Sequence, residues 1–282
     1  MKTLLSGFFI LCSLVSRAQT RLDCCSREDN PTRSFALLGR LADFRAAHLQ
    51  PLPFKLEKKM GKDFTFPTPD GKDGHGYLVV AQKPTRNYLL VFHEWWGLND
   101  YIRKMCDQLQ LDLGKTNVIA IDLYDGQVAT TPKMAGKYMQ EVKESRAIAL
   151  IKGVIQFAGK KAKIATIGWC FGGGWSLQAT LLAGKQAIGC VMYYGMPETN
   201  LARLKTLHTD VLGIFANLDE WITPKVVERF EKNMQLAGKK LIVHQYNAVH
   251  GFANPSNPKH DIAATASAYQ YTLDFLRPRL NK

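Results

Sequence analysis

The sequence predicts an α/β fold with a mostly parallel central sheet that helices cover on both faces. Short apolar segments alternate with helical segments along most of the chain, which is the pattern of βαβ units. Several of these apolar segments lack a polar face, as strands of a parallel sheet do when both faces are buried. The chain has 282 residues, 46% of them hydrophobic, so it can bury a sizeable core without disulfide bonds.

The first 18 residues have the features of a secretory signal peptide. Lys2 provides a basic start, an apolar run extends over residues 4–15, and Ser16 and Ala18 occupy the −3 and −1 positions of a cleavage site. The run is too short to span a bilayer, and no other apolar stretch approaches that length. We therefore expect a protein without a membrane span that is exported, periplasmic or secreted, after cleavage near Ala18.

Residues 19–61 are expected to form an N-terminal extension that carries one docking helix. Between residues 34 and 49, apolar side chains recur three positions apart, which indicates an amphipathic helix. These side chains are Phe35, Leu38, Leu41 and Phe44. Residues 62–282 are expected to form a single domain, because this part of the chain contains no repeat and no low-complexity linker.

The predicted domain begins with a β-hairpin whose turn lies between residues 70 and 76. The apolar segments after it predict strands at 88–93, 118–123, 164–167, 187–194, 211–216 and 241–246. The helical segments lie at 101–113, 131–158 with one break, 171–182, 224–237 and 261–275. The carboxyl ends of parallel strands share one edge of the sheet, and that edge is where ligands bind in such folds.

The most specific local pattern is KIATIGWCFGGGWS at residues 163–176. An apolar strand turns into a helix through G-x-C-x-G, the pattern of a nucleophile elbow with Cys170 as the nucleophile. Gly168 and Gly172 give the tight turn the space it needs. The helix N-terminus favours the thiolate, and the N–H of Phe171 can form half of an oxyanion hole. The alternatives are an incidental buried cysteine, or a phosphate loop without its Lys-Ser/Thr pair.

Two later strand ends supply the base and the acid that a thiol nucleophile requires. Asp219 follows the strand at 211–216, and His250 follows the strand at 241–246. Both should therefore lie at the same edge of the sheet as Cys170. The order nucleophile, acid, histidine is that of α/β-hydrolases. We predict an α/β-hydrolase fold and a Cys-His-Asp triad that reacts through an acyl-enzyme.

Other residues compete for these roles. Asp219 could instead cap the helix that begins near Pro224, and Glu220 is the nearest alternative acid. His244 alternates within a strand and is expected to be structural. The other histidines are expected at the surface: His48, His75, His208 and His260.

The segment HEWWGLN at residues 93–99 follows the strand at 88–93. It is not the zinc motif H-E-x-x-H, because Gly97 stands at the second histidine position. We expect a backbone N–H near Trp95 to complete the oxyanion hole, and Glu94 to contact the thiol and control its ionisation. Tryptophans here can also be plain packing. The expected pocket residues are Trp96, Trp169 and Tyr124.

The charge and the cysteines limit the remaining possibilities. The formal net charge is +13, and loss of the first 18 residues lowers it by two. The lysines are scattered and no nucleic-acid motif accompanies them, so we expect a solvated basic surface and no nucleic-acid partner. A preference for anionic substrates or an anionic envelope surface is the alternative.

Loss of Cys12 with the signal peptide leaves five cysteines, an odd number, so at least one thiol is free. Cys170 is the candidate for the free thiol, and the pairing of the other cysteines stays open.

Together, GWCFGGG, HEWWGLN, IDLYDG (121–126), Asp219 and VHGFAN resemble the dienelactone hydrolase family. The resemblance covers residues 64–276. It implies an α/β-hydrolase whose Cys-His-Asp triad opens small-molecule ester or lactone bonds. It also implies that Glu94 holds the resting cysteine until substrate displaces it. We expect a monomer that needs no metal ion and no cofactor.

The sequence departs from the family at two positions. Family members that act on dienelactone carry two arginines that clamp the substrate carboxylate, and here the aligned residues are Gly126 and Asn254. Neither residue replaces the bidentate guanidinium. The expected substrate is therefore a neutral or differently shaped ester. Alternatives are a thioesterase or amidase, an esterase of acylated envelope sugars, and a non-catalytic ligand-binding or redox protein.

Overall fold

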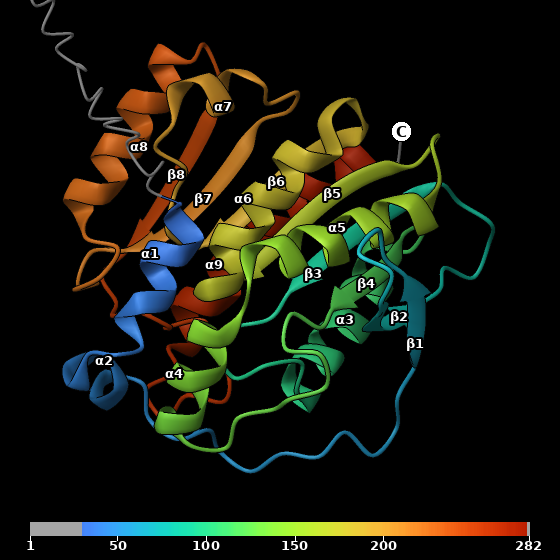
Figure 1. The fold of residues 1–282 in the computed structure, drawn as a ribbon. Helices are drawn as coiled ribbons and strands as arrows, with labels where there is room; N and C mark the ends of the chain where they lie inside the picture. The colour runs from blue at the N-terminus through green and yellow to red at the C-terminus, as the bar shows by residue number, and fades with distance from the viewer. Residues whose placement is uncertain (1–29, 281–282) are drawn as a thin grey trace, which may run out of the picture.

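A computed structural model describes residues 30–280, and its centre is one eight-stranded sheet (Figure 1). The strands are β1 (Lys62–Pro67), β2 (Asp73–Val79), β3 (Asn87–Phe92), β4 (Asn117–Ile121), β5 (Lys163–Trp169), β6 (Ala187–Tyr193), β7 (Val211–Ala216) and β8 (Leu241–Tyr246). Their order across the sheet is β1-β2-β4-β3-β5-β6-β7-β8. Strand β2 pairs antiparallel with β1 and β4, and all other neighbours are parallel. The predicted fold class is confirmed.

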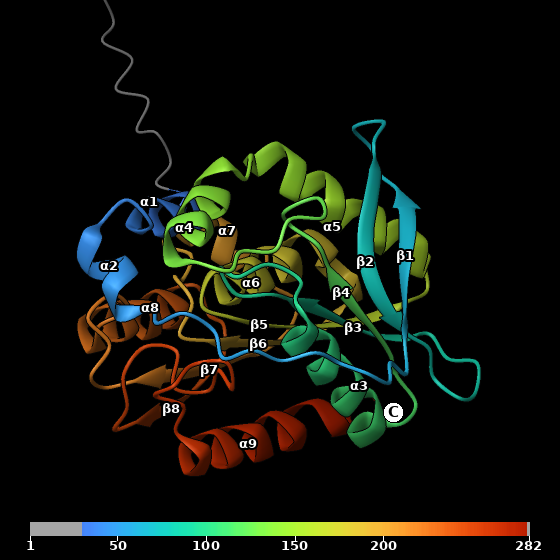
Figure 2. The ribbon, with the colours of Figure 1, turned by 90° about the horizontal axis from the view of Figure 1, so that it is seen from below.

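Helices cover both faces of this sheet. Helices α5, α6 and α8 lie on one face, and α3 and α9 lie on the other (Figures 1 and 2). The helices of the domain are α3 (Asp100–Leu113), α4 (Pro132–Glu141), α5 (Glu144–Ala158), α6 (Phe171–Ala183), α7 (Leu201–Lys205), α8 (Pro224–Leu236) and α9 (Ile262–Leu280). The predicted break in the segment 131–158 falls between α4 and α5. The short α7 was not predicted, because its five residues bury only Leu204 and give no periodic pattern.

The N-terminal extension differs from the single helix predicted over residues 34–49. It forms two short helices, α1 (Pro31–Leu38) and α2 (Ala42–Ala47). The chain turns between them because Leu41 is extended, with φ −73° and ψ 132°. Both helices dock on the domain through a fully buried aromatic ring, Phe35 from α1 and Phe44 from α2. The expected signal peptide at residues 1–18 lies outside the described residues.

Within residues 30–280, no helix combines the length and the apolar character needed to cross a bilayer.

Truncation of Phe44 should weaken the docking of α2. Its ring lies 5.4 Å from the ring of Trp95 and 5.1 Å from that of Trp221, and the side chain has no exposed surface. Replacing a buried Phe by Ala typically lowers the free energy of unfolding by about 3–5 kcal/mol. We expect Phe44→Ala to lower the free energy of unfolding in urea by about 3 kcal/mol, whereas Leu41→Ala, at a position 47% exposed, should change it little. Equal effects of the two variants would contradict this docking role.

Candidate active site

Cys170 lies in a strained turn between β5 and α6. Its backbone has φ 55° and ψ −120°, a left-handed region that non-glycine residues rarely adopt. The neighbouring backbone is packed without room for side chains. A Cβ on Gly168 would lie 2.1 Å from the carbonyl oxygen of Gly172, and a Cβ on Gly172 would lie 2.3 Å from that of Phe92. The turn therefore has the geometry predicted for a nucleophile elbow.

Asp219 and His250 are joined by a hydrogen bond beside this turn. The Nδ1–H of His250 donates to Asp219 Oδ2 at 2.6 Å, and the backbone N–H groups of Trp221 and Ile222 donate to Oδ1 at 2.8 Å. Burial raises the pKa of Asp219, but the charge of His250 and these donors outweigh it and leave the pKa lowered. The carboxylate stays ionised and fixes Nδ1 as the protonated nitrogen. A ring nitrogen of His250 lies within 4.8 Å of Cys170 Sγ.

Two backbone N–H groups act on the cysteine thiol. Hydrogen bonding from the N–H groups of Phe171 and Trp95 favours the thiolate and offsets part of the rise that burial causes in the pKa of Cys170. These are the two donors that the sequence predicted for an oxyanion hole, and they come from separate segments of the chain. The sulfur therefore occupies the place where an oxyanion would be stabilised.

Hydrogen bonds from the side chains of His93 and Tyr124 fix the backbone of the loop that carries Trp95. The Nδ1–H of His93 donates to the carbonyl oxygen of Glu94 at 2.6 Å, and its Nε2 accepts from the N–H of Leu123 at 3.1 Å. Burial lowers the pKa of His93, so the ring is neutral and keeps these two roles. The hydroxyl of Tyr124 donates to the carbonyl oxygen of Trp95 at 3.1 Å. Both side chains thus position the loop.

Glu94 is buried next to the thiol. The hydroxyl of Tyr194 donates to its Oε1 at 3.4 Å, and the amide of Asn254 donates to Oε2. Burial raises the pKa of Glu94 to about 8, although both hydrogen bonds lower it. Burial, followed by the charge of Glu94, raises the pKa of Cys170 well above its usual value. The resting cysteine is therefore a neutral thiol.

The raised pKa of Glu94 predicts a pH-dependent stability. Between its ordinary pKa of 4.5 and the folded value of about 8, the folded protein keeps a proton that the unfolded chain has released. The free energy of unfolding therefore falls as pH rises through this window, by up to about 1.4 kcal/mol per pH unit for one proton. Glu94→Gln removes this proton. The free energy of unfolding in urea of Glu94→Gln minus that of wild type should therefore increase by a few kcal/mol from pH 5 to pH 8.

The matched control is Glu220→Gln, because Glu220 is exposed. Its stability relative to wild type should not change with pH. A pH-independent difference between Glu94→Gln and wild type would show that the carboxyl group is ionised throughout the window.

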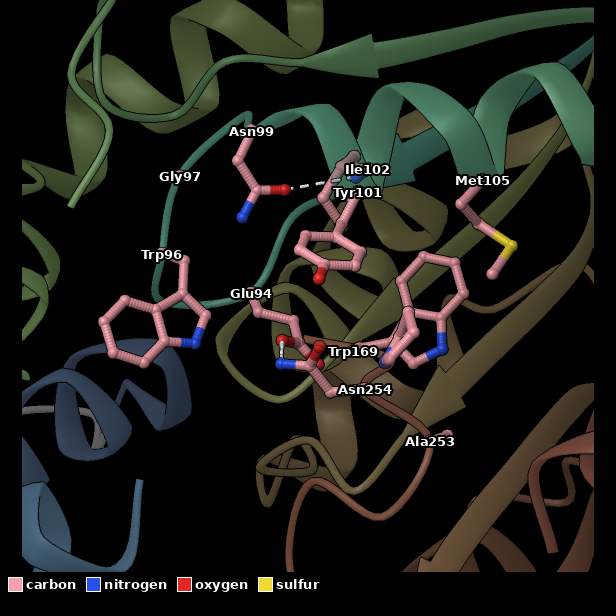
Figure 3. Close-up of a pocket in the computed structure, with 11 residues that line it drawn as sticks. Glu94, Trp96, Gly97, Asn99, Tyr101, Ile102, Met105, Trp169, Ala253 and Asn254 are labelled. Atoms are coloured by element: carbon pink, nitrogen blue, oxygen red, sulfur yellow. Dashed lines mark hydrogen bonds between the residues drawn. The ribbon is translucent and has the colours of Figure 1, made fainter. Parts of the chain in front are cut away.

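A narrow pocket reaches Glu94 from the surface (Figure 3). It encloses about 380 Å³ of empty space, its open mouth included. Its lining includes Trp96 and Trp169, which lie on opposite sides of Glu94, and Asn254 (Figure 3). Tyr124, predicted as a pocket residue, is absent from the lining because its ring packs behind the loop of Trp95.

The N-terminal extension brings an unpredicted histidine to the triad. His48, expected at the surface, lies with its ring centroid 5.2 Å from that of His250 and 4.5 Å from that of Trp95. Its Nδ1–H donates to the carbonyl oxygen of Phe44 at 2.6 Å. Burial, followed by the charge of His250, lowers the pKa of His48 to about 3, so the ring is neutral. The surface prediction for His48 is therefore wrong.

The remaining predicted residues lie where expected. His75 and His208 are exposed, and His260 is half-buried beside Thr265. The half-buried ring of His244 stacks on Tyr271 at 3.6 Å, which is a structural role. The described cysteines are free thiols: Cys106, Cys170 and Cys190. The pairing of Cys24 and Cys25 lies outside the described residues.

Sequence reasoning missed Tyr194 as well as His48. Tyr194 has a left-handed backbone, with φ 35°, and its ring lies 5.0 Å from the ring of His250. It follows directly after β6, so its place at the carboxyl edge of the sheet could have been found. For His48 the sequence offered no such signal, because it lies on no strand of the sheet.

Comparisons with known proteins identify the family of the chain. The model of the dienelactone hydrolase family matches residues 75–280. A carboxymethylenebutenolidase of Pseudomonas putida is 26% identical over 229 residues, covering 74% of this chain and 94% of the relative. Carboxymethylenebutenolidase 1 of Cupriavidus pinatubonensis is 23% identical over 222 residues, covering 73% and 93%.

A solved structure shares the fold. A dienelactone hydrolase-like promiscuous phosphotriesterase from metagenomic libraries superposes with a TM-score of 0.64 at 20% identity, covering 78% of this chain and 99% of that one. The fold is that of the α/β-hydrolases. Since the family model spans most of the domain, the chain belongs to the dienelactone hydrolase family and is a hydrolase of that kind.

Proposed function

We propose that this protein hydrolyses carboxylic esters or lactones through an acyl-enzyme on Cys170. The observation that supports this most is the convergence of three elements on one sulfur atom. The sulfur sits on a strained turn, the N–H groups of Phe171 and Trp95 act on its thiol, and it lies within 4.8 Å of a ring nitrogen of His250, which is hydrogen-bonded to Asp219. This is the arrangement that covalent acyl transfer requires.

The reaction begins with a neutral thiol. Substrate displaces Glu94 and places its carbonyl oxygen between the N–H groups of Phe171 and Trp95, so the sulfur turns toward His250. His250 Nε2 takes the thiol proton, and the thiolate attacks the carbonyl carbon. The tetrahedral intermediate collapses, and His250 returns the proton to the leaving alcohol oxygen. A water molecule, deprotonated by His250, then releases the acid and regenerates the thiol.

The pocket favours an uncharged substrate. Its polar lining at the deep end is the pair of Glu94 and Asn254, and the rest is largely apolar and aromatic. The amide of Asn254 is already engaged with Glu94, and Gly126 has no side chain to offer. Neither residue can clamp a substrate carboxylate as an arginine does. A neutral ester or lactone with a flat or slender acyl group is therefore the substrate class.

We also propose that the protein works outside the cytoplasm as a monomer. The basic start, apolar run and small residues of positions 1–18 support export. In such a compartment, a cysteine that stays a neutral thiol at rest resists oxidation, because the thiolate is the reactive form.

The function is tested with a panel of p-nitrophenyl esters, neutral lactones, a thioester, an anilide and a carboxylate-bearing dienelactone. We expect turnover of neutral esters or lactones, with kcat/KM at least about tenfold above that of the dienelactone. His250→Ala should lower the turnover by about 10³-fold or more. If wild type and His250→Ala are equally inert on the whole panel, the proposal fails. If the protein prefers the thioester or the anilide, its substrates are thioesters or amides and not carboxylic esters or lactones.

A further inference from the structure

The three side chains that meet at the candidate active site have the composition of a metal-binding site. One ring nitrogen of His48, the Sγ of Cys170 and one ring nitrogen of His250 all lie within 4.8 Å of one another. Two imidazoles and one thiol form a donor set that suits zinc and related borderline-soft divalent cations. His48 comes from the N-terminal extension, outside the matched family region, so this set is a property of this chain.

Both imidazoles are already held in the form that binds a metal. The Nδ1–H of His250 donates to Asp219, and the Nδ1–H of His48 donates to the carbonyl oxygen of Phe44, each at 2.6 Å. Metal-binding histidines nearly always donate their second N–H to a carboxylate or carbonyl oxygen in this way. The proton on Nδ1 leaves the lone pair on Nε2 available in both rings.

Within the described part of the chain, neither proposed ligating nitrogen has a hydrogen-bond partner. These nitrogens, the Nε2 atoms of His48 and His250, are both shielded from solvent. Buried polar atoms in folded proteins are nearly always paired, so two orphaned nitrogens beside one thiol call for a ligand. A positive ion between them satisfies both nitrogens at once.

We propose that His48, Cys170 and His250 bind one zinc ion, with a water molecule as the fourth ligand. Ligand atoms around a tetrahedral zinc ion are about 3.5 Å apart, given bond lengths of about 2.0–2.3 Å, so the widest pair must close by roughly 1 Å. Rotation of the cysteine and small ring movements suffice. Binding forms one Zn–S and two Zn–N bonds, the thiol proton leaves to solvent, and no atom changes oxidation state.

The zinc ion occupies the nucleophile and the base together. Bound zinc therefore inhibits hydrolysis. This inhibition rests on the proposed function, whereas zinc binding does not depend on it. The N-terminal extension thus supplies the third ligand that turns a cysteine-histidine pair into a chelating site.

Cobalt provides the direct test of binding. Cys12, Cys24 and Cys25 are first replaced by serine in the full chain, so that the thiols remaining are Cys106, Cys170 and Cys190. Titration with Co²⁺ should give one equivalent of binding, a thiolate-to-metal charge-transfer band and the intense visible bands of four-coordinate cobalt. Cys170→Ala should abolish the charge-transfer band. Persistence of that band in Cys170→Ala would place the metal on another thiol and overturn the proposal.

The role of His48 is tested by zinc competition against a chromogenic chelator. His48→Ala and His48→Gln should each weaken zinc binding by more than the roughly 10–100-fold typical of losing an outer partner. His208→Ala, at an exposed histidine, is the matched control and should bind as wild type. Thermal unfolding checks that each variant is folded, and the Gln variant keeps a side-chain N–H donor near Phe44. Wild-type affinity in both folded His48 variants would overturn the three-residue site.

Inhibition is measured separately, so that the two proposals can fail independently. Zinc should inhibit ester hydrolysis reversibly, with EDTA restoring it, and the His48 variants should need correspondingly more zinc. Binding without any hydrolytic activity would refute the proposed function and leave the metal site standing. Full activity at saturating zinc would refute the inhibition.

Discussion

Replacing Cys170 by alanine is expected to lower kcat/KM for p-nitrophenyl acetate by at least about 10³-fold. The thiol is acted on by the N–H groups of Phe171 and Trp95 and lies within 4.8 Å of a ring nitrogen of His250. Alanine keeps the left-handed backbone at φ 55° but has no nucleophile. The residual rate should reflect only binding and the backbone donors.

The matched control for this variant is Cys190→Ala. Cys190 is also a buried free thiol, but it contacts Ser176 in the core, with 3.7 Å between sulfur and hydroxyl oxygen. We expect it to retain most of the activity. Both proteins should show cooperative thermal unfolding, which separates a loss of chemistry from a loss of fold. Substantial ester hydrolysis by Cys170→Ala would mean that another residue is the nucleophile.

The largest effect on stability is expected for Gly168→Ala. The added methyl group would lie 2.1 Å from the carbonyl oxygen of Gly172, which belongs to the backbone of the same tight turn. No side chain can move aside, so the elbow itself must open. We expect a loss of more than about 4 kcal/mol in the free energy of unfolding, or failure to accumulate as soluble protein.

Gly174→Ala offers a control in the same helix. A Cβ there would lie 3.2 Å from its nearest neighbour, the carbonyl oxygen of Met196, and alanine is the better helix former by up to about 1 kcal/mol. Urea unfolding should therefore show a change of about 1 kcal/mol or less for Gly174→Ala. If Gly168→Ala is as stable as Gly174→Ala, the claim that the backbone leaves no room for a side chain at Gly168 is contradicted.

The sheet and the grouping of Cys170, Asp219 and His250 could be predicted because each depends on local signals. The buried parallel strands are apolar on both faces, and Cys170 and Asp219 lie just beyond the ends of two of them, β5 and β7. His250 follows the partly buried edge strand β8. Because these strands are parallel, their carboxyl ends, and therefore the three residues, share one edge of the sheet. The turn at Cys170 was predictable from Gly168 and Gly172, since only glycine fits there.

The contribution of the N-terminal extension could not be predicted in the same way. An apolar residue every third position indicates a buried face, but it does not specify which part of the domain that face covers. Leu41 interrupts the expected helix, and the change of direction brings His48 toward His250 rather than toward solvent. Similarly, the role of Tyr124 depends on a single hydrogen bond to Trp95, which no sequence period encodes.

The covalent intermediate is the most direct test of the central claim. Wild-type protein mixed with excess p-nitrophenyl ester is quenched in acid within the first turnovers, and its intact mass and peptides are measured. We predict a mass increase equal to one acyl group, located on the peptide that contains Cys170 and absent from Cys170→Ala. Hydrolysis with a stoichiometric burst but with the acyl group on a different residue, or with none on Cys170, would contradict the mechanism.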